Sequence, residues 1–230
     1  MKILQRGLAA IISITAIVIV LITSFEIGAY SDYGWYEKEY AKYGVLEELD
    51  MEMDDVIHVT EEMMAYLRGN RSDLVVHTNV DGREREFFND REKAHMVDVK
   101  NLFVGGLWIR RIAVCLLGVT IIVLIKTKAD WKRILPKSFL IGLGAFVGIT
   151  VGAGLLFMSD FNKYFLLFHE MFFRNDLWLL NPETDLLIRM LPEGFFLDMV
   201  RRIGIIFLIF LSVGVIISII ALCRPKNKNN

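Results

Sequence analysis

Four long apolar stretches constrain this chain more than any other feature of its sequence. Three of them, residues 8–25, 138–159 and 203–223, contain no charged residue, and the fourth, residues 107–125, carries only two arginines. A helix rises about 1.5 Å per residue, so each stretch is long enough to cross a hydrocarbon core about 30 Å thick. A helix also satisfies its backbone hydrogen bonds internally, as lipid requires. The sequence therefore predicts four transmembrane helices, which agrees with a composition that is 54% hydrophobic.

The first apolar stretch has two interpretations, an uncleaved anchor and a secretory signal peptide. Lys2 and Arg6 precede it, as basic residues do in both. The stretch is longer than the usual signal-peptide core of about 7–15 residues, and no clean A-x-A cleavage site follows it. We therefore expect residues 8–25 to remain in the protein as the first span.

Basic residues gather in three of the segments that lie outside the predicted spans. Residues 1–7 contain two, the connection 126–137 contains five, and the tail 224–230 contains three. By contrast, residues 26–106 hold 19 acidic against 9 basic residues, and residues 160–202 hold 7 against 5. Because Lys and Arg favour the cytoplasmic side, we expect both termini and the connection 126–137 to be cytoplasmic. The net charge of −1 thus reflects membrane topology and gives no indication of nucleic-acid binding.

Turn and capping residues predict local structure in the first outer segment, residues 26–106. Residues 45–69 are expected to be helical and to end at Gly69. A β-hairpin is expected to turn at Asp81-Gly82. A further helix is expected to begin at Asn89 or Asp90 and to run into the second span.

The second outer segment, residues 160–202, is rich in Phe and partly amphipathic, which favours a position in the membrane interface. Asn181-Pro182 predicts the start of a short helix that stops before Pro192. The expected fold is therefore mainly α: a four-transmembrane-helix bundle with an extracytoplasmic α+β cap and an interfacial helical second outer segment.

The third span carries Gly144, Gly148 and Gly152 at intervals of four residues, which places them on one face of a helix. Small residues at this spacing let helices approach closely. We expect this glycine face to form a tight contact with another helix, with a substrate groove as the alternative.

Six aromatic residues follow the first span, and we expect them to form a belt at the level of the lipid headgroups. They are Tyr30, Tyr33, Trp35, Tyr36, Tyr40 and Tyr43.

The two cysteines exclude one class of chemistry at the outer face. Cys115 lies inside the second span and Cys223 lies at the cytoplasmic end of the fourth, so we expect no disulfide between them. No thiol lies in either outer segment, which excludes a cysteine nucleophile there.

All four histidines lie in the outer segments, and two of them are placed at membrane boundaries. His95 shares a predicted helix face with Glu92 and Asp98, so Asp98 is expected to accept a hydrogen bond from its ring. The alternative is a surface charge pair at a helix end. His169 lies in the apolar stretch YFLLFHEMFF, where an ionisable group is costly and therefore a functional candidate. Together the two histidines could supply a general base and a general acid.

His58 and His77 have simpler explanations, and two other classes of function remain open. His58 lies in an acidic helical stretch and is expected to be solvated, and a strand histidine such as His77 is more often structural. A zinc site formed by His95, His169 and nearby carboxylates would make the protein a metal-dependent membrane hydrolase, but no HExxH motif supports it. A non-enzymatic membrane partner protein would need neither histidine.

Five further residues are candidates for contact with a substrate or with lipid. Arg110 and Arg111 stand at the outer end of the second span, where they could reach the headgroups, pair with carboxylates or orient a substrate. Arg174, Asn175 and Trp178 follow His169 in the second outer segment.

Four stretches of the chain resemble the lipoprotein intramolecular transacylase family, called Lit, of low-GC Gram-positive bacteria. They are REKAHMVDVKNLF at 91–103, FHEMFFRNDLW at 168–178, NPETDLLIRMLP at 181–192 and GFFLD at 194–198. The resemblance covers essentially the whole chain. It implies an enzyme of the bacterial cytoplasmic membrane that needs no cofactor and no metal, with an active site at the outer face.

The resemblance also implies a reaction and a pair of catalytic residues. Enzymes of this family move the acyl chain at the sn-2 position of a diacylglyceryl-modified lipoprotein cysteine onto the α-amine of the same cysteine. The product is an N-acyl S-monoacylglyceryl, or lyso-form, lipoprotein. The two catalytic histidines of the family match His95 and His169. The helix face that they share with His95 makes Asp98 and Glu92 the expected supporting residues. The expected partners are diacylglyceryl-modified lipoproteins and membrane lipids; the sequence leaves the oligomeric state open.

Overall fold

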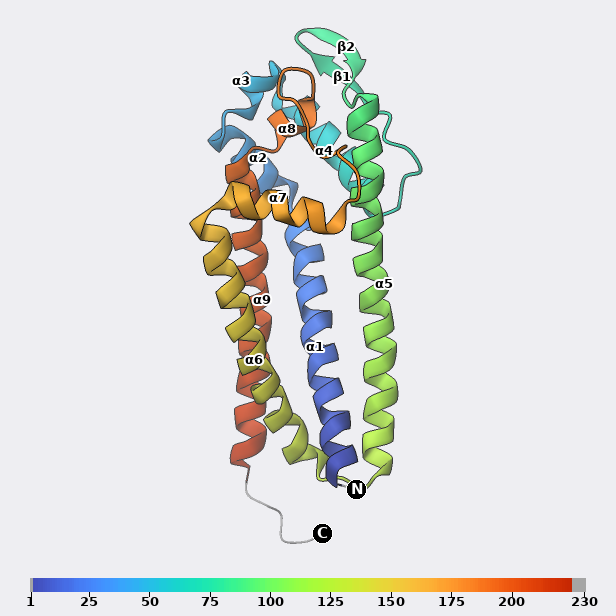
Figure 1. Cartoon of the computed structure of the whole chain (residues 1–230), viewed down its shortest axis with the longest axis vertical. Coiled ribbons are helices and arrows are strands. Elements are labelled where there is room, and N and C mark those ends of the chain that lie inside the picture. The colour runs from blue at the N-terminus through green and yellow to red at the C-terminus, as the bar shows by residue number, and fades with distance from the viewer. Residues whose placement is uncertain (1, 225–230) are drawn as a thin grey trace. The chain divides into compact units, whose positions relative to one another are not determined.

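The computed structural model describes residues 2–224, together with the side chains of all of these except 153, 154, 156–159 and 161. Of the predicted tail 224–230, residues 225–230 lie outside this range. The described chain is mainly helical with one two-stranded sheet (Figure 1). Its elements are α1 (Lys2–Tyr30), α2 (Tyr33–Lys42), α3 (Val45–Leu49), α4 (Met53–Leu67), β1 (His77–Val80), β2 (Arg83–Glu86), α5 (Asp90–Lys126), α6 (Trp131–Ser159), α7 (Phe161–Phe172), α8 (Leu186–Met190) and α9 (Glu193–Cys223).

The chain divides into two compact units, each built from several stretches of sequence. The bundle unit consists of Met1–Phe25, Trp108–Phe165 and Gly204–Asn230, and the polar unit consists of Glu26–Leu107 and Leu166–Ile203. The helices α1, α5, α7 and α9 contribute residues to both units.

The four predicted spans are confirmed as long apolar helices. Among the described residues, four helices are long and apolar enough to cross a membrane: Lys2–Tyr30, Asp90–Lys126, Trp131–Gly152 and Glu193–Cys223. The helices α1, α5, α6 and α9 each begin before the apolar stretch that predicted them, because the polar residues that precede the stretch continue the same helix.

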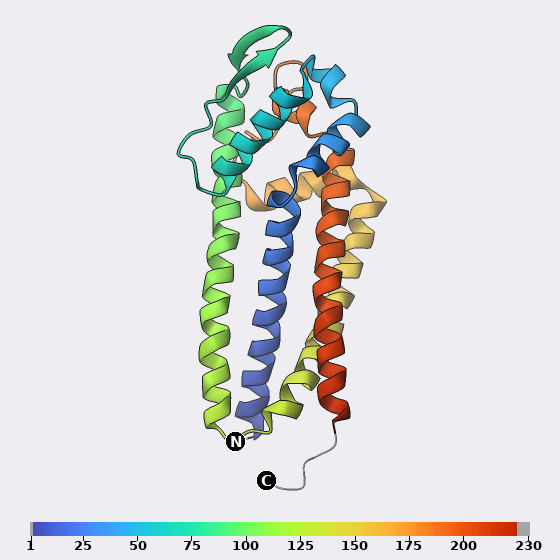
Figure 2. The same ribbon diagram turned by 180° about the vertical axis from the view of Figure 1, so that it is seen from behind.

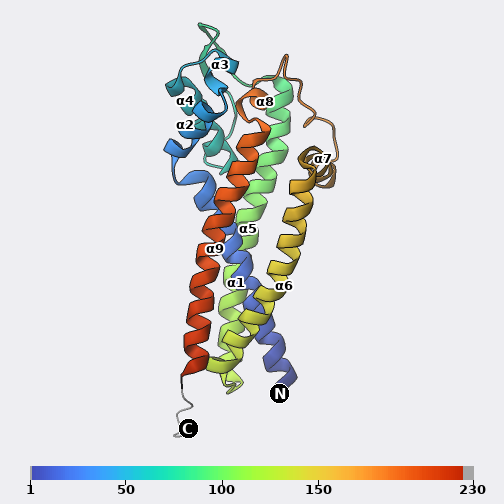
Figure 3. The same ribbon diagram turned by 90° about the vertical axis from the view of Figure 1, so that its left-hand side faces the viewer.

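Within the bundle unit, α1, α6 and α9 share a small apolar core. Ile17 of α1 packs with Phe207 and Leu211 of α9, and Phe139 and Phe146 of α6 lie against them. These helices lie side by side in Figure 3. Many other apolar side chains of the unit are exposed, as expected of a surface that faces lipid.

The glycine face does not form the expected contact within the chain. A Cβ atom added at Gly144, Gly148 or Gly152 would meet nothing within 4 Å among the described atoms. The close approaches lie elsewhere: a Cβ at Gly142 would be 3.6 Å from the Ser13 Cβ, and one at Gly214 would be 2.7 Å from the Phe139 ring. The prediction was wrong because helix α6 turns a different face toward its neighbours.

An aromatic cluster forms part of the core of the polar unit, which corrects the predicted belt. The side chains of Tyr36 and Tyr40 are buried, and both rings pack against Phe195, with centroids 5.7 and 5.8 Å away. The Tyr36 hydroxyl donates to the Ala29 carbonyl oxygen at 2.8 Å, and the Tyr40 hydroxyl shares a hydrogen bond of 2.7 Å with Thr60. A tyrosine can be buried once its hydroxyl has such a partner, so these two are core residues.

The single helix predicted over residues 45–69 is two helices, α3 and α4. Asp50 adopts a left-handed conformation with φ of 49°, which ends α3, and the Met51 N–H donates back to the Leu46 carbonyl oxygen at 3.1 Å. The end of α4 is as predicted, because Gly69 has φ of 84° and the Asn70 N–H returns to the Ala65 carbonyl oxygen at 2.9 Å.

The predicted hairpin is confirmed. Strands β1 and β2 are antiparallel with Val80 opposite Arg83, and both turn residues, Asp81 and Gly82, have positive φ, as a type I′ turn requires. The hairpin packs on α4, where the Thr78 hydroxyl donates to Asp55 at 3.0 Å. The hairpin and α4 lie at the same end of the ribbon in Figure 2.

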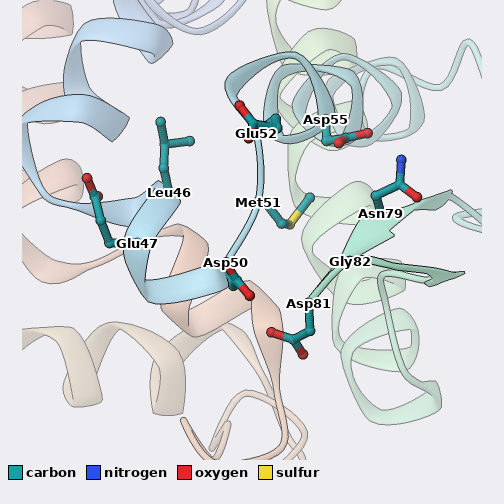
Figure 4. Close-up of a pocket in the computed structure, with 9 residues that line it drawn as sticks. All are labelled: Leu46, Glu47, Asp50, Met51, Glu52, Asp55, Asn79, Asp81 and Gly82. Carbon is teal, nitrogen blue, oxygen red and sulfur yellow. The ribbon is translucent and has the colours of Figure 1, made fainter.

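The polar unit also contains a pocket of about 540 Å³ between α3, the start of α4 and the hairpin (Figure 4). Its lining is strongly acidic and includes neither of the two candidate histidines. The lining residues are Leu46, Glu47, Asp50, Met51, Glu52, Asp55, Asn79, Asp81 and Gly82.

Candidate active site

The first turn of α5 is held by a reciprocal pair of hydrogen bonds that positions His95. The Asn89 side-chain oxygen accepts the Glu92 N–H at 3.0 Å, and the Glu92 carboxylate accepts the Asn89 N–H at 2.7 Å. This is a capping box, in which each residue satisfies a free backbone donor at the helix start. It confirms Asn89 as the N-cap and places His95 one turn into the helix.

Glu92 reaches a second helix with its other oxygen. The side chain is fully buried at 0% exposure, and its Oε1 accepts the Leu187 N–H of α8 at 2.6 Å. The Asn89 amide in turn donates to Asp185 at 2.7 Å. Glu92 therefore joins the first turn of α5 to the start of α8, and Asn89 joins it to Asp185, which directly precedes α8.

The helix predicted from Asn181-Pro182 begins later, at Leu186, because Asp185 folds the preceding residues into a turn. The Asp185 carboxylate accepts the Asn181 N–H at 2.7 Å, and the Asp185 N–H donates to the Asn181 carbonyl oxygen at 2.8 Å. Burial alone would raise the pKa of Asp185, but hydrogen bonds from Asn181, Asn89 and Thr184 lower its pKa overall.

His169 of α7 lies beside His95, so two histidines from different outer segments form one pair. Their ring centroids are 6.1 Å apart, and the side chains are 7% and 8% exposed. Phe173 contacts both rings, at 5.3 Å from His95 and 5.4 Å from His169. The Phe173 N–H donates to the His169 carbonyl oxygen at 2.8 Å, which fixes the backbone at the end of α7. We call His95 and His169 the histidine pair.

Aromatic side chains enclose the His169 side of the pair. The Trp178 ring lies over the His169 ring with centroids 4.9 Å apart and an interplanar angle of 31°, and Phe168 lies at 5.5 Å. Phe173 completes the aromatic surround, and the His169 side chain is only 8% exposed.

Asp98 does not make the expected hydrogen bond to His95. Its Oδ2 accepts the Asn175 side-chain amide at 2.8 Å instead. His95 Nδ1 is buried and has no hydrogen-bond partner within the part of the chain that the structure describes. A buried polar atom without a partner is unusual, and a catalytic role is one explanation for it.

Of the five residues proposed to contact substrate or lipid, only two lie at the histidine pair. Asn175 and Trp178 lie at the histidine pair, and Arg174 beside them is exposed. Arg110 and Arg111 belong to the bundle unit, where the Arg111 guanidinium lies 4.8 Å from the centroid of the Trp108 ring.

The other two histidines are exposed and lie on elements that do not carry the histidine pair. The histidine pair alone would give a metal ion only two ligands. His58 lies on α4 and His77 on β1. Across residues 2–224 as described, no group of three His, Cys, Asp or Glu side chains is arranged to hold a metal ion.

Two features of the site were missed at the sequence level. Phe173 follows His169 by four residues, and this spacing could have placed it on the same helix face. The bond between Asp98 and Asn175 crosses 77 residues, and no local pattern predicts it.

Comparison with known proteins gives one family match and a set of similar solved structures. Residues 10–196 match the family described as lipoprotein intramolecular transacylase Lit. The structure of the membrane integral lipoprotein intramolecular transacylase Lit from Bacillus cereus is similar, with a TM-score of 0.78 and 20% sequence identity, over 96% of this chain and 97% of that chain. Two structures of the same Bacillus cereus protein, with one histidine changed to alanine or to arginine, each give a TM-score of 0.72. Both are 20% identical and cover 95% of this chain, and 93% and 92% of their own chains. No curated protein matches the chain.

Proposed function

This chain belongs to the lipoprotein intramolecular transacylase family, and from that premise we propose that it moves an sn-2 acyl chain within a diacylglyceryl-modified lipoprotein. The acyl chain leaves the glyceryl oxygen and joins the α-amine of the same cysteine. One ester C–O bond breaks, one amide C–N bond forms, and the product is the lyso-form lipoprotein. The observation that supports this proposal is the buried histidine pair, formed by one residue from each outer segment.

The histidine pair supplies the two proton transfers that this reaction needs. One neutral imidazole accepts a proton from the α-amine as its nitrogen attacks the ester carbonyl carbon. The tetrahedral intermediate then collapses, and the other imidazole gives a proton to the departing glyceryl oxygen. General acid–base catalysis of this kind contributes roughly 10²–10⁴-fold. At the start the donor imidazole is protonated and the acceptor imidazole is neutral. Two buried imidazoles 6.1 Å apart disfavour a double positive charge, so uptake of the amine proton by one favours release of the other's proton to the glyceryl oxygen.

Direct aminolysis explains why the site needs no protein nucleophile. An α-amine with a pKa of about 7.7–8.0 is partly neutral at physiological pH. The amine and the ester belong to one molecule, and well-oriented intramolecular reactions reach effective molarities of about 10⁵ M or more. The aromatic surround of Phe168, Phe173 and Trp178 limits the access of water, and this disfavours hydrolysis of the ester.

The orientation of the protein in the membrane is inferred from the distribution of its Lys and Arg residues. The protein is an integral multi-pass membrane protein. We place both termini in the cytoplasm and residues 26–106 and 160–202 outside, because the basic segments mark the cytoplasmic side. The histidine pair then lies on the outer face, where the lipid-modified cysteine of a lipoprotein is found.

Mass spectrometry of a lipoprotein's N-terminal peptide tests the proposal. In cells that rely on this protein, His95→Ala and His169→Ala should each reduce the lyso-form yield by about 100-fold or more, because each removes a proton-transfer group. His58→Ala and His77→Ala are matched controls that remove exposed histidines and should leave the yield unchanged. Normal yield from either His95→Ala or His169→Ala, at equal protein level in the membrane, would contradict the proposed mechanism.

A further inference from the structure

Asn175 takes part in three hydrogen bonds, and together they organise the residues that follow α7. Its side-chain Nδ2 donates to Asp98 Oδ2 at 2.8 Å, and its Oδ1 accepts the Leu177 N–H at 3.2 Å. Its backbone carbonyl oxygen accepts the Trp178 indole N–H at 2.8 Å. One residue therefore holds the turn, the indole and a carboxylate on another helix.

The indole that Asn175 holds is the one that lies over His169. The Trp178 and His169 centroids are 4.9 Å apart, and the bond from Trp178 Nε1 fixes the direction in which the indole ring can point. An aromatic ring packed at this distance restricts the rotation of the imidazole. Asn175 thus acts on His169 through Trp178.

The other end of the Asn175 bond is on the helix that carries His95. Asp98 follows His95 by three residues on α5, so the two side chains leave the same face one turn apart. The bond between Asp98 and Asn175 consequently links the His95 helix to the segment that holds the ring of His169.

We propose that Asp98 and Asn175 are positioning residues, whose hydrogen bond holds the two imidazoles of the histidine pair at their working separation. This inference rests on the proposed function, since it assigns these residues to the same reaction. It replaces two expectations: that Asp98 binds the His95 ring, and that Asn175 contacts substrate. Neither residue needs to touch the reacting atoms in this arrangement.

An exchange of the two side chains tests this proposal, because the hydrogen bond can run in either direction. Asn175→Asp alone sets two carboxylates against each other and should lower the lyso-form rate about tenfold or more, since hydrogen bonds to charged groups are strong. Adding Asp98→Asn rebuilds the bond with an amide at 98 and a carboxylate at 175. The carboxylate at 175 can still accept the Leu177 N–H. The double variant should therefore recover to within about threefold of the original rate.

A matched control separates the bond from the added charge. Asn101→Asp introduces a carboxylate three residues beyond Asp98, on an exposed position of α5, and should leave the rate unchanged. Rates at several lipoprotein concentrations should show that Asn175→Asp lowers kcat and leaves KM nearly constant, since a positioning residue acts on the chemical step.

Three results would overturn the positioning role. One is full activity of Asn175→Asp. Another is a double variant no better than Asn175→Asp, which would mean that the charge of Asp98 or the amide of Asn175 is itself required. The third is an effect on KM alone, which would indicate substrate contact. His95→Ala and His169→Ala, assayed beside these variants, distinguish the outcomes: if they are active, the proposed function itself fails, and if they are inactive, only the positioning role is at issue.

Discussion

Glu92 shows how a single buried carboxylate can serve two helices. One oxygen accepts the Asn89 N–H at the start of α5 and the other accepts the Leu187 N–H at the start of α8. A carboxylate suits this position because both oxygens are acceptors, and helix N-termini favour negative charge. The residue therefore supports His95 through the helix start.

Glu92→Gln tests this role because it replaces one carboxylate oxygen by an NH₂ group and changes little else. The amide keeps one acceptor oxygen but turns an NH₂ group toward the other backbone N–H, so one buried donor loses its partner. We expect the free energy of unfolding to fall by about 1–3 kcal/mol, measured by thermal unfolding in detergent micelles. Glu84→Gln, which removes an exposed carboxylate from β2, is the control and should change little. A Glu92→Gln protein as stable as the original would mean that the two bonds contribute nothing measurable.

Residue periodicity predicted which side chains share a face with His95 but not what those side chains bind. Glu92 and Asp98 do lie one turn on either side of His95, as expected from their spacing. Their partners, Leu187 and Asn175, come from the second outer segment, 95 and 77 residues away. Such contacts depend on tertiary packing, which a local pattern does not contain.

At the scale of elements, the start of α9 depends on a close approach between Gly194 and the Tyr43 ring. A Cβ at residue 194 would overlap that ring, whose hydroxyl donates to Asp198 at 2.6 Å. The absence of a side chain at Gly194 thus allows α9 to pack beside the residues that end α2.

Gly194→Ala should therefore destabilise the protein although alanine favours helices. The ring of Tyr43 has to move and its bond to Asp198 is lost, at a cost of about 1 kcal/mol. Gly204→Ala is a matched control on the same helix, where a Cβ would meet nothing within 4 Å, and it should be neutral or stabilising. The two apparent melting temperatures in detergent should move in opposite directions or differ by several degrees. Equal shifts for both variants would contradict the steric explanation.

Turns and helix ends marked by glycine or by an Asp-Gly pair were predicted correctly. Helix boundaries that depend on an unusual backbone conformation or on a distant hydrogen bond were not. The hairpin turn at Asp81-Gly82 and the helix end at Gly69 follow from residues that tolerate positive φ. The break after α3 depends on Asp50 in the left-handed region, which aspartate adopts only occasionally. The late start of α8 depends on the turn in which the Asp185 carboxylate accepts the Asn181 N–H. The sequence Asn181-Pro182 suits this turn as well as it suits the start of a helix.

For the whole molecule, the orientation of the four spans is the main prediction that remains to be tested. In a variant with Cys115 and Cys223 replaced by serine, single cysteines at Asn70, Glu183 and Asp130 occupy exposed positions. A membrane-impermeant maleimide added to intact cells should label residues 70 and 183 but not residue 130, because residue 130 lies in the basic connection. Labelling of residue 130 in intact cells would reverse the orientation.

The number of spans could be predicted because the length of an apolar helix is set by the membrane itself. The packing between spans could not be predicted, since lipid and protein are equally apolar and the contact depends on close packing and hydrogen bonds between particular helices. This is why the glycine face of α6 was expected to meet another helix, while the close approaches are found at Gly142 and Gly214.

The bond between Glu92 and Leu187 also sets an order of events during synthesis. The two residues are 95 positions apart, so α5 leaves the ribosome long before the N–H that its carboxylate will bind exists. Until then the carboxylate has to stay hydrated, because an unpaired charge is costly to bury. A nascent chain interrupted between these residues can contain His95 but not the completed site around it.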